Sequence, residues 1–254
     1  MGLMKTAGWT LMNLGIDPRR MKDGRRLGRY LHDRRQWLKK GGSIDVTFPI
    51  LGDFDESAGT AVGHYFHMDL LVARFIAEAM PQRHLDVGSR IDGFVAHVAA
   101  FRTIEIMDIR PVSIPAHPQI RFIQGDLMQS QTETIGQVDS LSCLHVLEHV
   151  GLGRYGDPID PLGHRRAFSN LVNLLAPGGI FYFAAPVGLG KVMFNAHRVF
   201  DPITVPQWEA NRLELERFDH VDDAGVLHLN SEPSEAEALE YGCGIYTFKR
   251  KCDQ

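Results

Sequence analysis

The sequence predicts an α/β protein: a Rossmann-like, seven-stranded, mostly parallel sheet with helices on both faces and a basic helical N-terminal arm. The first observation is that short apolar segments alternate with helical ones, as in parallel sheets with crossover helices. The second is the type of residue at the end of each apolar segment. A glycine turn at Gly88 ends the first, and the acids Asp108 and Asp126 end the second and third. In an open parallel sheet these positions line the ligand crevice.

The elements follow from periodicity and turn residues. A helix is predicted over 65–80, where apolar residues recur at helical spacing before Pro81. In chain order, the elements after it are a strand at 83–88, a helix at 94–101, strands at 103–108, 120–126 and 138–144, a helix at 165–175 and a strand at 180–185. The last two strands, 213–220 and 244–251, are expected to pair antiparallel as a hairpin-like edge.

Composition limits the class of protein. A chain of 254 residues with 44% hydrophobic residues can bury one good core plus an appendage. No apolar run is long enough for a membrane span, and the N-terminus lacks a signal-peptide pattern. The three cysteines form no C-x-x-C pair and are odd in number, which favours a reducing compartment, the cytoplasm.

Charge is distributed unevenly along the chain. Residues 1–43 hold eleven Lys/Arg and three Asp, so the other 211 residues carry sixteen basic and twenty-eight acidic side chains. We therefore expect a basic arm at 1–43 and an α/β domain at 44–254. The arm either packs on the acidic body or reaches an anionic partner, including the surface of a membrane. Nucleic acid is disfavoured because the arm lacks the interleaved aromatic residues of a stacking platform. The oligomeric state is left open.

The chain also resembles a known superfamily. The strings Leu85-Asp86-Val87-Gly88, Met107-Asp108, Gly125-Asp126-Leu127, Leu147-Glu148-His149-Val150 and Leu174-Leu175-Ala176-Pro177-Gly178-Gly179 occur in the order found in class I S-adenosylmethionine-dependent methyltransferases. The 88–90 turn and the glycine-rich loop at 151–158 more narrowly resemble a little-characterised methyltransferase-like family of no secure substrate. The resemblance implies S-adenosyl-L-methionine as cofactor.

The residues expected at the cofactor are those of the strand ends and turns. They are Asp86, Gly88, Ser89, Arg90, Asp108, Asp126, Leu127 and His145. For Asp86 a second interpretation is open, in which it only hydrogen-bonds the turn. The usual turn is Gly-x-Gly, whereas this one reads Gly88-Ser89-Arg90. Arg90 either pairs with the carboxylate of the cofactor or fills the pocket and abolishes binding.

Three residues are expected in catalysis. A hydroxyl acceptor needs a general base, so His149 after the fourth strand and His197 after the fifth are the candidates. Asp157, in the glycine-rich loop, is expected to contact a polar acceptor. The structural alternatives are a buried, hydrogen-bonded histidine for His149 and a turn-forming residue for Asp157.

Two functions are consistent with these residues, and they belong to different classes. The first is methyl transfer to a polar small-molecule or glycan-type acceptor at oxygen. The second is a non-catalytic methyltransferase-like module whose basic arm engages a partner. The letters His145-Val-Leu-Glu148-His149 also fit the H-x-x-E-H pattern of inverted zinc proteases, but a strand ends immediately before them, so no metal site is assigned.

Overall fold

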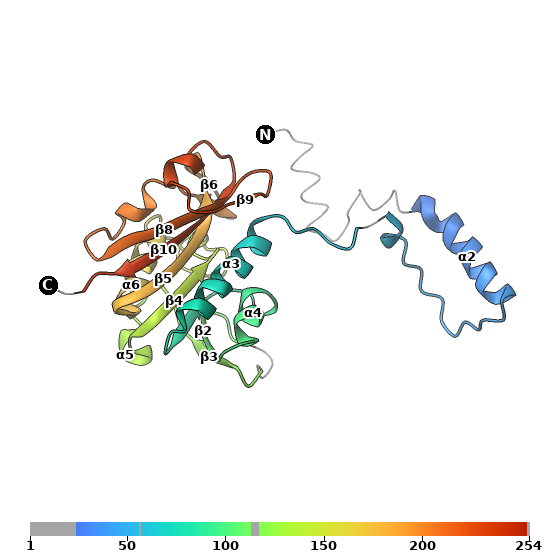
Figure 1. The fold of residues 1–254 in the computed structure, drawn as a ribbon, viewed down its shortest axis with the longest axis horizontal. Helices are drawn as coiled ribbons and strands as arrows, with labels where there is room; N and C mark the ends of the chain where they lie inside the picture. The colour runs from blue at the N-terminus through green and yellow to red at the C-terminus, as the bar shows by residue number, and fades with distance from the viewer. Residues whose placement is uncertain (1–23, 56, 113–116, 253–254) are drawn as a thin grey trace. The chain divides into compact units, whose positions relative to one another are not determined.

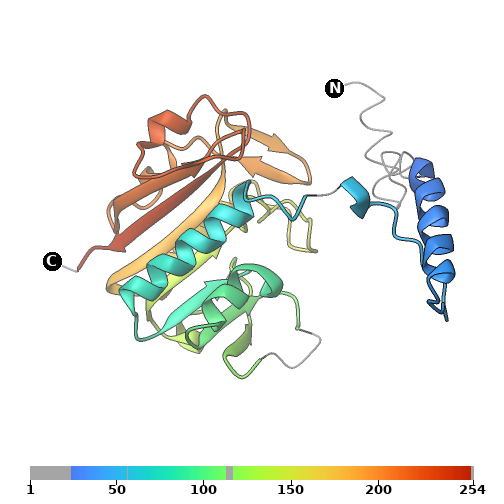
Figure 2. The ribbon, with the colours of Figure 1, turned by 45° about the vertical axis from the view of Figure 1, so that its right-hand side comes forward.

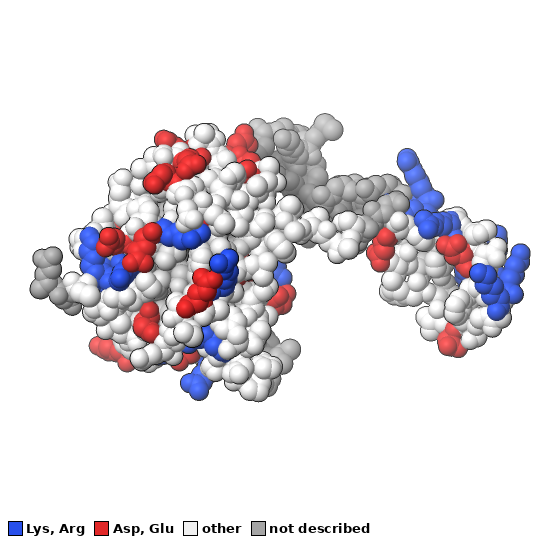
Figure 3. All heavy atoms as spheres, in the orientation of Figure 1, with Lys and Arg blue, Asp and Glu red and all other residues white. Residues whose placement is uncertain are grey.

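The computed structural model describes residues 24–55, 57–112 and 117–252, and it divides into two units, residues 1–60 and residues 61–254 (Figure 1). The described part of the first unit contains helix α2 (Leu27–Lys39) and a short 3-10 turn, η2 (Asp53–Asp55). Helix α2 has no buried residue, and Lys and Arg side chains gather on it (Figure 3). Residues 1–23 of the expected arm lie outside the described residues. Among the described helices, none is long and apolar enough to cross a membrane.

The second unit is built on one mixed sheet of eight strands. Its order is β3-β2-β1-β4-β5-β10-β8-β9. The strands are β1 (His84–Val87), β2 (Ile104–Asp108), β3 (Ile120–Gln124), β4 (Val138–Leu144), β5 (Leu175–Val187), β8 (Leu213–Val221), β9 (Leu227–His228) and β10 (Gly242–Arg250). A separate two-stranded ribbon pairs β6 (Lys191–Met193) with β7 (His197–Val199).

The five strands from β3 to β5 are parallel, as predicted. The predicted antiparallel pairing of the last two long strands, β8 and β10, is confirmed. Two expectations are wrong. The sheet has eight strands because the two-residue strand β9 pairs with β8, and β9 therefore occupies the edge. Strand β10 lies inside the sheet, antiparallel to both β5 and β8.

Helices cover both faces of the sheet. Helix α3 (His64–Ala79) and α4 (Ala96–Ala99), which follows the π-helical turn η3 (Ile91–Val95), pack on one face (Figure 2). Helix α6 (Gly163–Leu174) packs on the other face, near the short helix α5 (Thr132–Ile135). Two more 3-10 turns, η4 (Val205–Gln207) and η5 (Pro233–Ala236), lie in the C-terminal third. Because side chains alternate along a strand, the central strands β4, β5 and β10 contribute apolar side chains to the cores on both faces of the sheet.

Strand β1 has an unusual polar face. Leu85 and Val87 pack into the core beneath α6. His84 and Asp86 alternate with them along the strand and are also buried. Beside them on β4 are Ser140 and Ser142, also buried. These four residues and Ser89 form the inner network of hydrogen bonds.

The inner network has a defined direction. Ser142 Oγ donates to Asp86 Oδ1, so it accepts from His84 Nε2 at 3.1 Å. His84 Nδ1 then accepts from Ser140 Oγ at 2.7 Å, which requires a neutral ring. Burial lowers the pKa of His84 to about 3, in agreement with that neutral state.

Candidate active site

Three cavities border the carboxyl ends of the parallel strands. One, of about 880 Å³, is lined by Gly88, Ser89, Arg90 and Asp108 among others, and the other two are lined by predicted histidines. The small cavity, about 100 Å³, is lined by residues that follow β1, β2, β3 and β4, including Gly88, Asp108, Asp126 and Leu127. The polar pocket, about 630 Å³, includes side chains from α3 together with His197 and Tyr241. The small cavity and the polar pocket share Gly88, Arg110, His145, His149 and Tyr155. The structure therefore brings the predicted strand-end residues to one crevice.

The glycine turn separates the small cavity from the polar pocket. Gly88 has φ +74°, and a Cβ atom there would meet the Val146 side chain at 2.9 Å. Glycine is therefore required by both conformation and space. Beneath the turn, Asp86 accepts hydrogen bonds from the Ser89 amide at 3.1 Å and the Ser89 hydroxyl at 2.9 Å. Asp86 is fully buried and lines neither cavity, so the structure gives it the role of holding the turn rather than contacting a ligand.

Arg90 does not fill the crevice. Its guanidinium pairs with Asp92, Nη2 to Oδ2 at 2.8 Å, and 68% of the side chain is exposed. It stands at the rim of the polar pocket together with Ser89. The space above the turn is therefore open, and the Gly88-Ser89-Arg90 sequence leaves the backbone accessible.

Asp108 ends β2 with its carboxylate held by a neighbour. Oδ1 accepts from the Arg110 amide at 2.8 Å and from Nε at 3.0 Å, while Oδ2 accepts from Nη2 at 2.7 Å. Burial would raise the pKa of Asp108, but these hydrogen bonds outweigh it and lower the pKa. The Arg110 guanidinium also lies 4.9 Å from the centre of the Tyr155 ring. Asp108 is thus ionised, and Oδ2 keeps one lone pair free.

Asp126 lies across the small cavity from the glycine turn. Its Oδ1 accepts from the Met128 amide at 2.9 Å, and its Oδ2 accepts from Gln129 Nε2 at 3.3 Å. Leu127 and Met128 add apolar surface to the same wall. This combination of an acid and apolar side chains suits a flat ring with polar edges.

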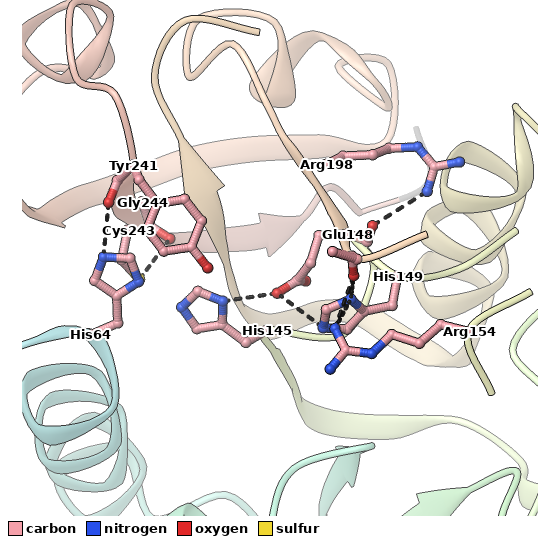
Figure 4. A network of polar contacts seen from close by, with 10 residues as sticks. His64, His145, Glu148, His149, Arg154, Arg198, Tyr241, Cys243 and Gly244 are labelled. Atoms are coloured by element: carbon pink, nitrogen blue, oxygen red, sulfur yellow. Dashed lines mark hydrogen bonds and ion pairs between the residues drawn. The ribbon is translucent and has the colours of Figure 1, made fainter. Parts of the chain in front are cut away.

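His145, Glu148 and His149 lie in the turns after β4 and not on a helix. His145 has φ +55°, a rare conformation for a side chain of its kind. Its Nδ1 pairs with Glu148 Oε1 at 2.8 Å, and His149 Nε2 lies 3.7 Å from the same oxygen (Figure 4). One carboxylate therefore lies between the two histidines. The absence of a helix at these residues removes the basis for the H-x-x-E-H protease interpretation.

Both proposed bases are neutral rings. His149 Nδ1 donates to the Ala196 carbonyl at 2.7 Å, which leaves Nε2 without a proton. Burial lowers the pKa of His149 and also that of His197, more than Glu148 raises either. The His197 ring lies 5.1 Å from that of Tyr241, and its Nε2 is buried without a hydrogen bond.

Unpartnered polar atoms concentrate in the polar pocket. Among the described residues, six buried side-chain atoms have no hydrogen-bond partner, and four of them belong to residues that line this pocket. We call these four residues the crevice cluster: Asp69 (Oδ1), His145 (Nε2), Glu148 (Oε2) and His197 (Nε2). Buried polar atoms are normally satisfied, so a concentration of exceptions marks a place where a ligand binds.

Asp157 lines the small cavity, and its carboxylate is hydrogen-bonded to the surrounding loop. Its carboxylate accepts from the backbone amides of Gly151 at 2.7 Å, Gly153 at 3.3 Å and Tyr155 at 3.2 Å. Burial would raise its pKa, yet the backbone hydrogen bonds lower it. The hydrogen bonds of the carboxylate favour the turn-forming alternative for Asp157, and its contact with an acceptor stays a prediction.

Several residues of the pocket carried no sequence signal. His64 and Asp69 come from α3, Tyr241 precedes β10, and Arg154 donates to the Ala196 carbonyl at 2.9 Å. The pattern of α3 predicted a helix packed on the core, and nothing in it distinguished the first turn. Only a chain-wide contact map could have placed these side chains opposite His145.

The sequence was compared with protein families and with curated proteins. The profile of a family described as a Caenorhabditis protein of unknown function, DUF268, matches residues 117–222, which include His145, His149 and His197. No curated protein sequence matches the chain.

Solved structures share the fold at low identity. The [4+2]-cyclase SpnF is 16% identical, with 73% of this chain and 82% of that chain covered and a TM-score of 0.53. The N-methyltransferase NodS from Bradyrhizobium japonicum WM9, in complex with S-adenosyl-l-homocysteine, is 16% identical, with 74% of this chain and 88% of that chain covered and a TM-score of 0.49. A TehB-like SAM-dependent methyltransferase from Corynebacterium glutamicum is 15% identical, with 88% of this chain and 97% of that chain covered and a TM-score of 0.46. One of these proteins is named for a cyclisation, so the fold by itself does not specify the reaction. The chain has the Rossmann-like fold that its motifs predicted, and it shares this fold with the [4+2]-cyclase SpnF.

Proposed function

We propose that this protein transfers the methyl group of S-adenosylmethionine to a hydroxyl of a polar small-molecule or carbohydrate-type acceptor. The observation that carries the proposal is the pair of adjoining cavities that share Gly88, His145 and His149. One cavity offers an acid and apolar walls, and the other offers several histidines. A donor and an acceptor would thus meet at the glycine turn.

The donor would occupy the small cavity. Asp108 would accept hydrogen bonds from the ribose hydroxyls, and Leu127 and Met128 would contact the base. The cavity of about 100 Å³ is smaller than the roughly 300–1,000 Å³ of most ligand pockets. Arg110 and Tyr155, whose side chains stack over each other and are half exposed, would swing outward to admit the nucleoside.

The transfer step needs alignment and one proton acceptor. The acceptor oxygen attacks the methyl carbon, the carbon–sulfur bond breaks, and its electron pair stays on sulfur. The hydroxyl proton passes to Nε2 of His149 or His197, the nitrogens that are free to accept it. Because burial keeps the pKa of both rings low, each is unprotonated at neutral pH.

Calorimetry on an Asp108→Ala variant tests the donor site. Losing a charged acceptor for a ribose hydroxyl should weaken S-adenosylhomocysteine binding by roughly 10- to 100-fold. The matched control is Asp222→Ala, because Asp222 also accepts backbone hydrogen bonds in a turn but lies outside both cavities. Equal affinity in wild type and Asp108→Ala would remove the donor assignment.

Kinetics on His149→Ala and His197→Ala test the base. The true base should lose about 100-fold or more in kcat with little change in S-adenosylhomocysteine affinity. Arg154→Ala separates orientation from proton transfer, since Arg154 shares the Ala196 carbonyl with His149 but cannot accept a proton. Full turnover in both histidine variants would end the assignment of a histidine base.

The non-catalytic alternative depends on a blocked crevice and on the arm. The Arg90–Asp92 pair, which keeps the guanidinium at the rim, supports the enzyme over that alternative. The basic segment 1–43 remains part of the proposal as a peripheral contact with an anionic surface, supported by the fully unburied α2. Deleting residues 1–43 should abolish salt-sensitive binding to anionic vesicles and leave S-adenosylhomocysteine binding intact. Vesicle binding that survives the deletion would contradict this role.

A further inference from the structure

We propose that His64, His145 and Cys243 form a zinc-binding site in the wall of the polar pocket. Each side chain offers one ligand atom, and these atoms lie within 4.8 Å of one another. They come from three separate elements: the first turn of α3, the residue after β4 and the second residue of β10. The site therefore exists only in the folded chain.

The hydrogen bonds of the two histidines select the ligand nitrogens. His64 Nε2 donates to the Tyr241 carbonyl at 3.1 Å, and His145 Nδ1 donates to Glu148 Oε1 at 2.8 Å. Nδ1 of His64 and Nε2 of His145 are left to bind the ion. In zinc sites the second nitrogen of each histidine characteristically donates to a carbonyl or a carboxylate, and here both kinds of partner are present.

Two of the ligand atoms are buried with little compensation, since Cys243 Sγ has only a long contact of 3.9 Å to the Gly244 carbonyl. His145 Nε2 is a buried atom with no hydrogen-bond partner, and only 3% of the His145 side chain is exposed. Cys243 is fully buried. A bound cation would satisfy both the nitrogen and the sulfur, which explains why His145 is held in its rare backbone conformation facing them.

The rings are positioned as a pair. The His64 and His145 planes are stacked, with centroids 5.2 Å apart and an angle of 10° between them (Figure 4). The stacking sets the two rings side by side, and one nitrogen of each lies within 4.8 Å of the other and of Cys243 Sγ.

The donor set identifies the metal. Two imidazoles and one thiolate suit Zn²⁺, which binds nitrogen at about 2.0 Å and sulfur at about 2.3 Å. Tetrahedral geometry at those lengths places ligand atoms about 3.5 Å apart, so the three side chains must draw together by about 1 Å.

The fourth position would face the pocket, since His64 and His145 line it and Cys243 lies behind them. Three protein ligands with an open position are the pattern of catalytic rather than structural zinc. A water or an acceptor hydroxyl bound there would lose its proton more readily, and this consequence rests on the proposed methyl transfer. The metal site itself does not.

Metal titration of the full chain, stripped with chelator, tests the site without cofactor or acceptor. Competition with a chromogenic chelator should show one Zn²⁺ per chain. Co²⁺ in its place should give tetrahedral visible bands and a thiolate-to-cobalt charge-transfer band. Cys243→Ser should lose the charge-transfer band, and His64→Ala should lose stoichiometric Zn²⁺ binding. The matched control is Cys143→Ser, a second fully buried sheet cysteine that should keep both.

A milder variant guards against misfolding. Glu148→Gln removes the charge behind His145 and should weaken Zn²⁺ binding by roughly 10- to 100-fold while circular dichroism stays unchanged. The proposal is overturned if the folded wild type binds no stoichiometric Zn²⁺, or if binding is unchanged in Cys243→Ser and His64→Ala. S-adenosylhomocysteine calorimetry on the same samples reports separately on the proposed function.

Discussion

Two sets of buried polar side chains, the inner network and the crevice cluster, differ in whether their atoms have partners. In the inner network, the His84, Asp86 and Ser142 side chains are all hydrogen-bonded. In the crevice cluster, each residue leaves one buried atom without a partner. The two sets belong to the same part of the fold, because β1 and β4 carry the first and lead directly into the turns that carry much of the second.

The difference in hydrogen bonding indicates a structural role for the inner network and a ligand-binding role for the crevice cluster. An unsatisfied buried polar group costs about 1–3 kcal/mol, so the crevice cluster lowers the stability of the unliganded protein. The inner network has no such cost and fixes the position of the Gly88 turn. We therefore expect replacements in the inner network to destabilise the fold, and replacements in the crevice cluster to affect binding with little loss of stability.

The largest effect should come from a pair of aspartates. Burial raises the pKa of both Asp86 and Asp69 to about 6. Asp86→Ala leaves hydrogen-bond donors on Ser89 and Ser142 without an acceptor, so the free energy of unfolding should fall by about 2–4 kcal/mol. Asp69→Ala should change it by about 1 kcal/mol or less, because Oδ1 has no partner and only the backbone hydrogen bond from Phe94 is lost. Urea unfolding of the two variants measures both, and equal losses would refute the distinction.

The next effect is a pH dependence carried by His84. The folded protein keeps this ring neutral down to a pKa of about 3, whereas the unfolded chain binds a proton near pH 6.5. The stability that it contributes is full above pH 6.5 and falls by about 1.4 kcal/mol for each pH unit below.

A His84→Asn variant isolates this contribution, because other titrating groups cancel in the comparison. The difference in unfolding free energy between wild type and variant should shrink by about 2 kcal/mol between pH 7 and pH 5. Denaturation at several pH values measures it. A constant difference over that range would show that His84 is not neutral in the folded state.

The smallest effect concerns a satisfied carboxylate inside the crevice. Asp157→Ala removes three hydrogen bonds to the 151–155 backbone, and we expect a loss of about 1 kcal/mol with faster proteolysis of that loop. Thermal unfolding and limited proteolysis measure the two quantities. If neither the thermal stability nor the rate of proteolysis changes, then the presence of hydrogen-bond partners does not distinguish structural residues from ligand-binding residues, even within one site.

The sequence by itself determined the sheet and its crevice. Apolar periodicity, Gly88 and the acids Asp108 and Asp126 are local signals, and the topology of a parallel sheet then brings strand ends together without further information. His145 and His149 were placed correctly for that reason. The role of Asp157 could not be decided from the sequence, because a turn aspartate and a ligand aspartate look identical until the backbone amides around them are known.

Tertiary structure alone decided the rest. The strand β9 has two residues and no periodicity, so its pairing with β8 could not be predicted. His64 and Cys243 face His145 only because α3 packs across the sheet and β10 inserts between β5 and β8. Such contacts join segments far apart in the chain, and their partners are set by packing rather than by the neighbouring residues in the sequence.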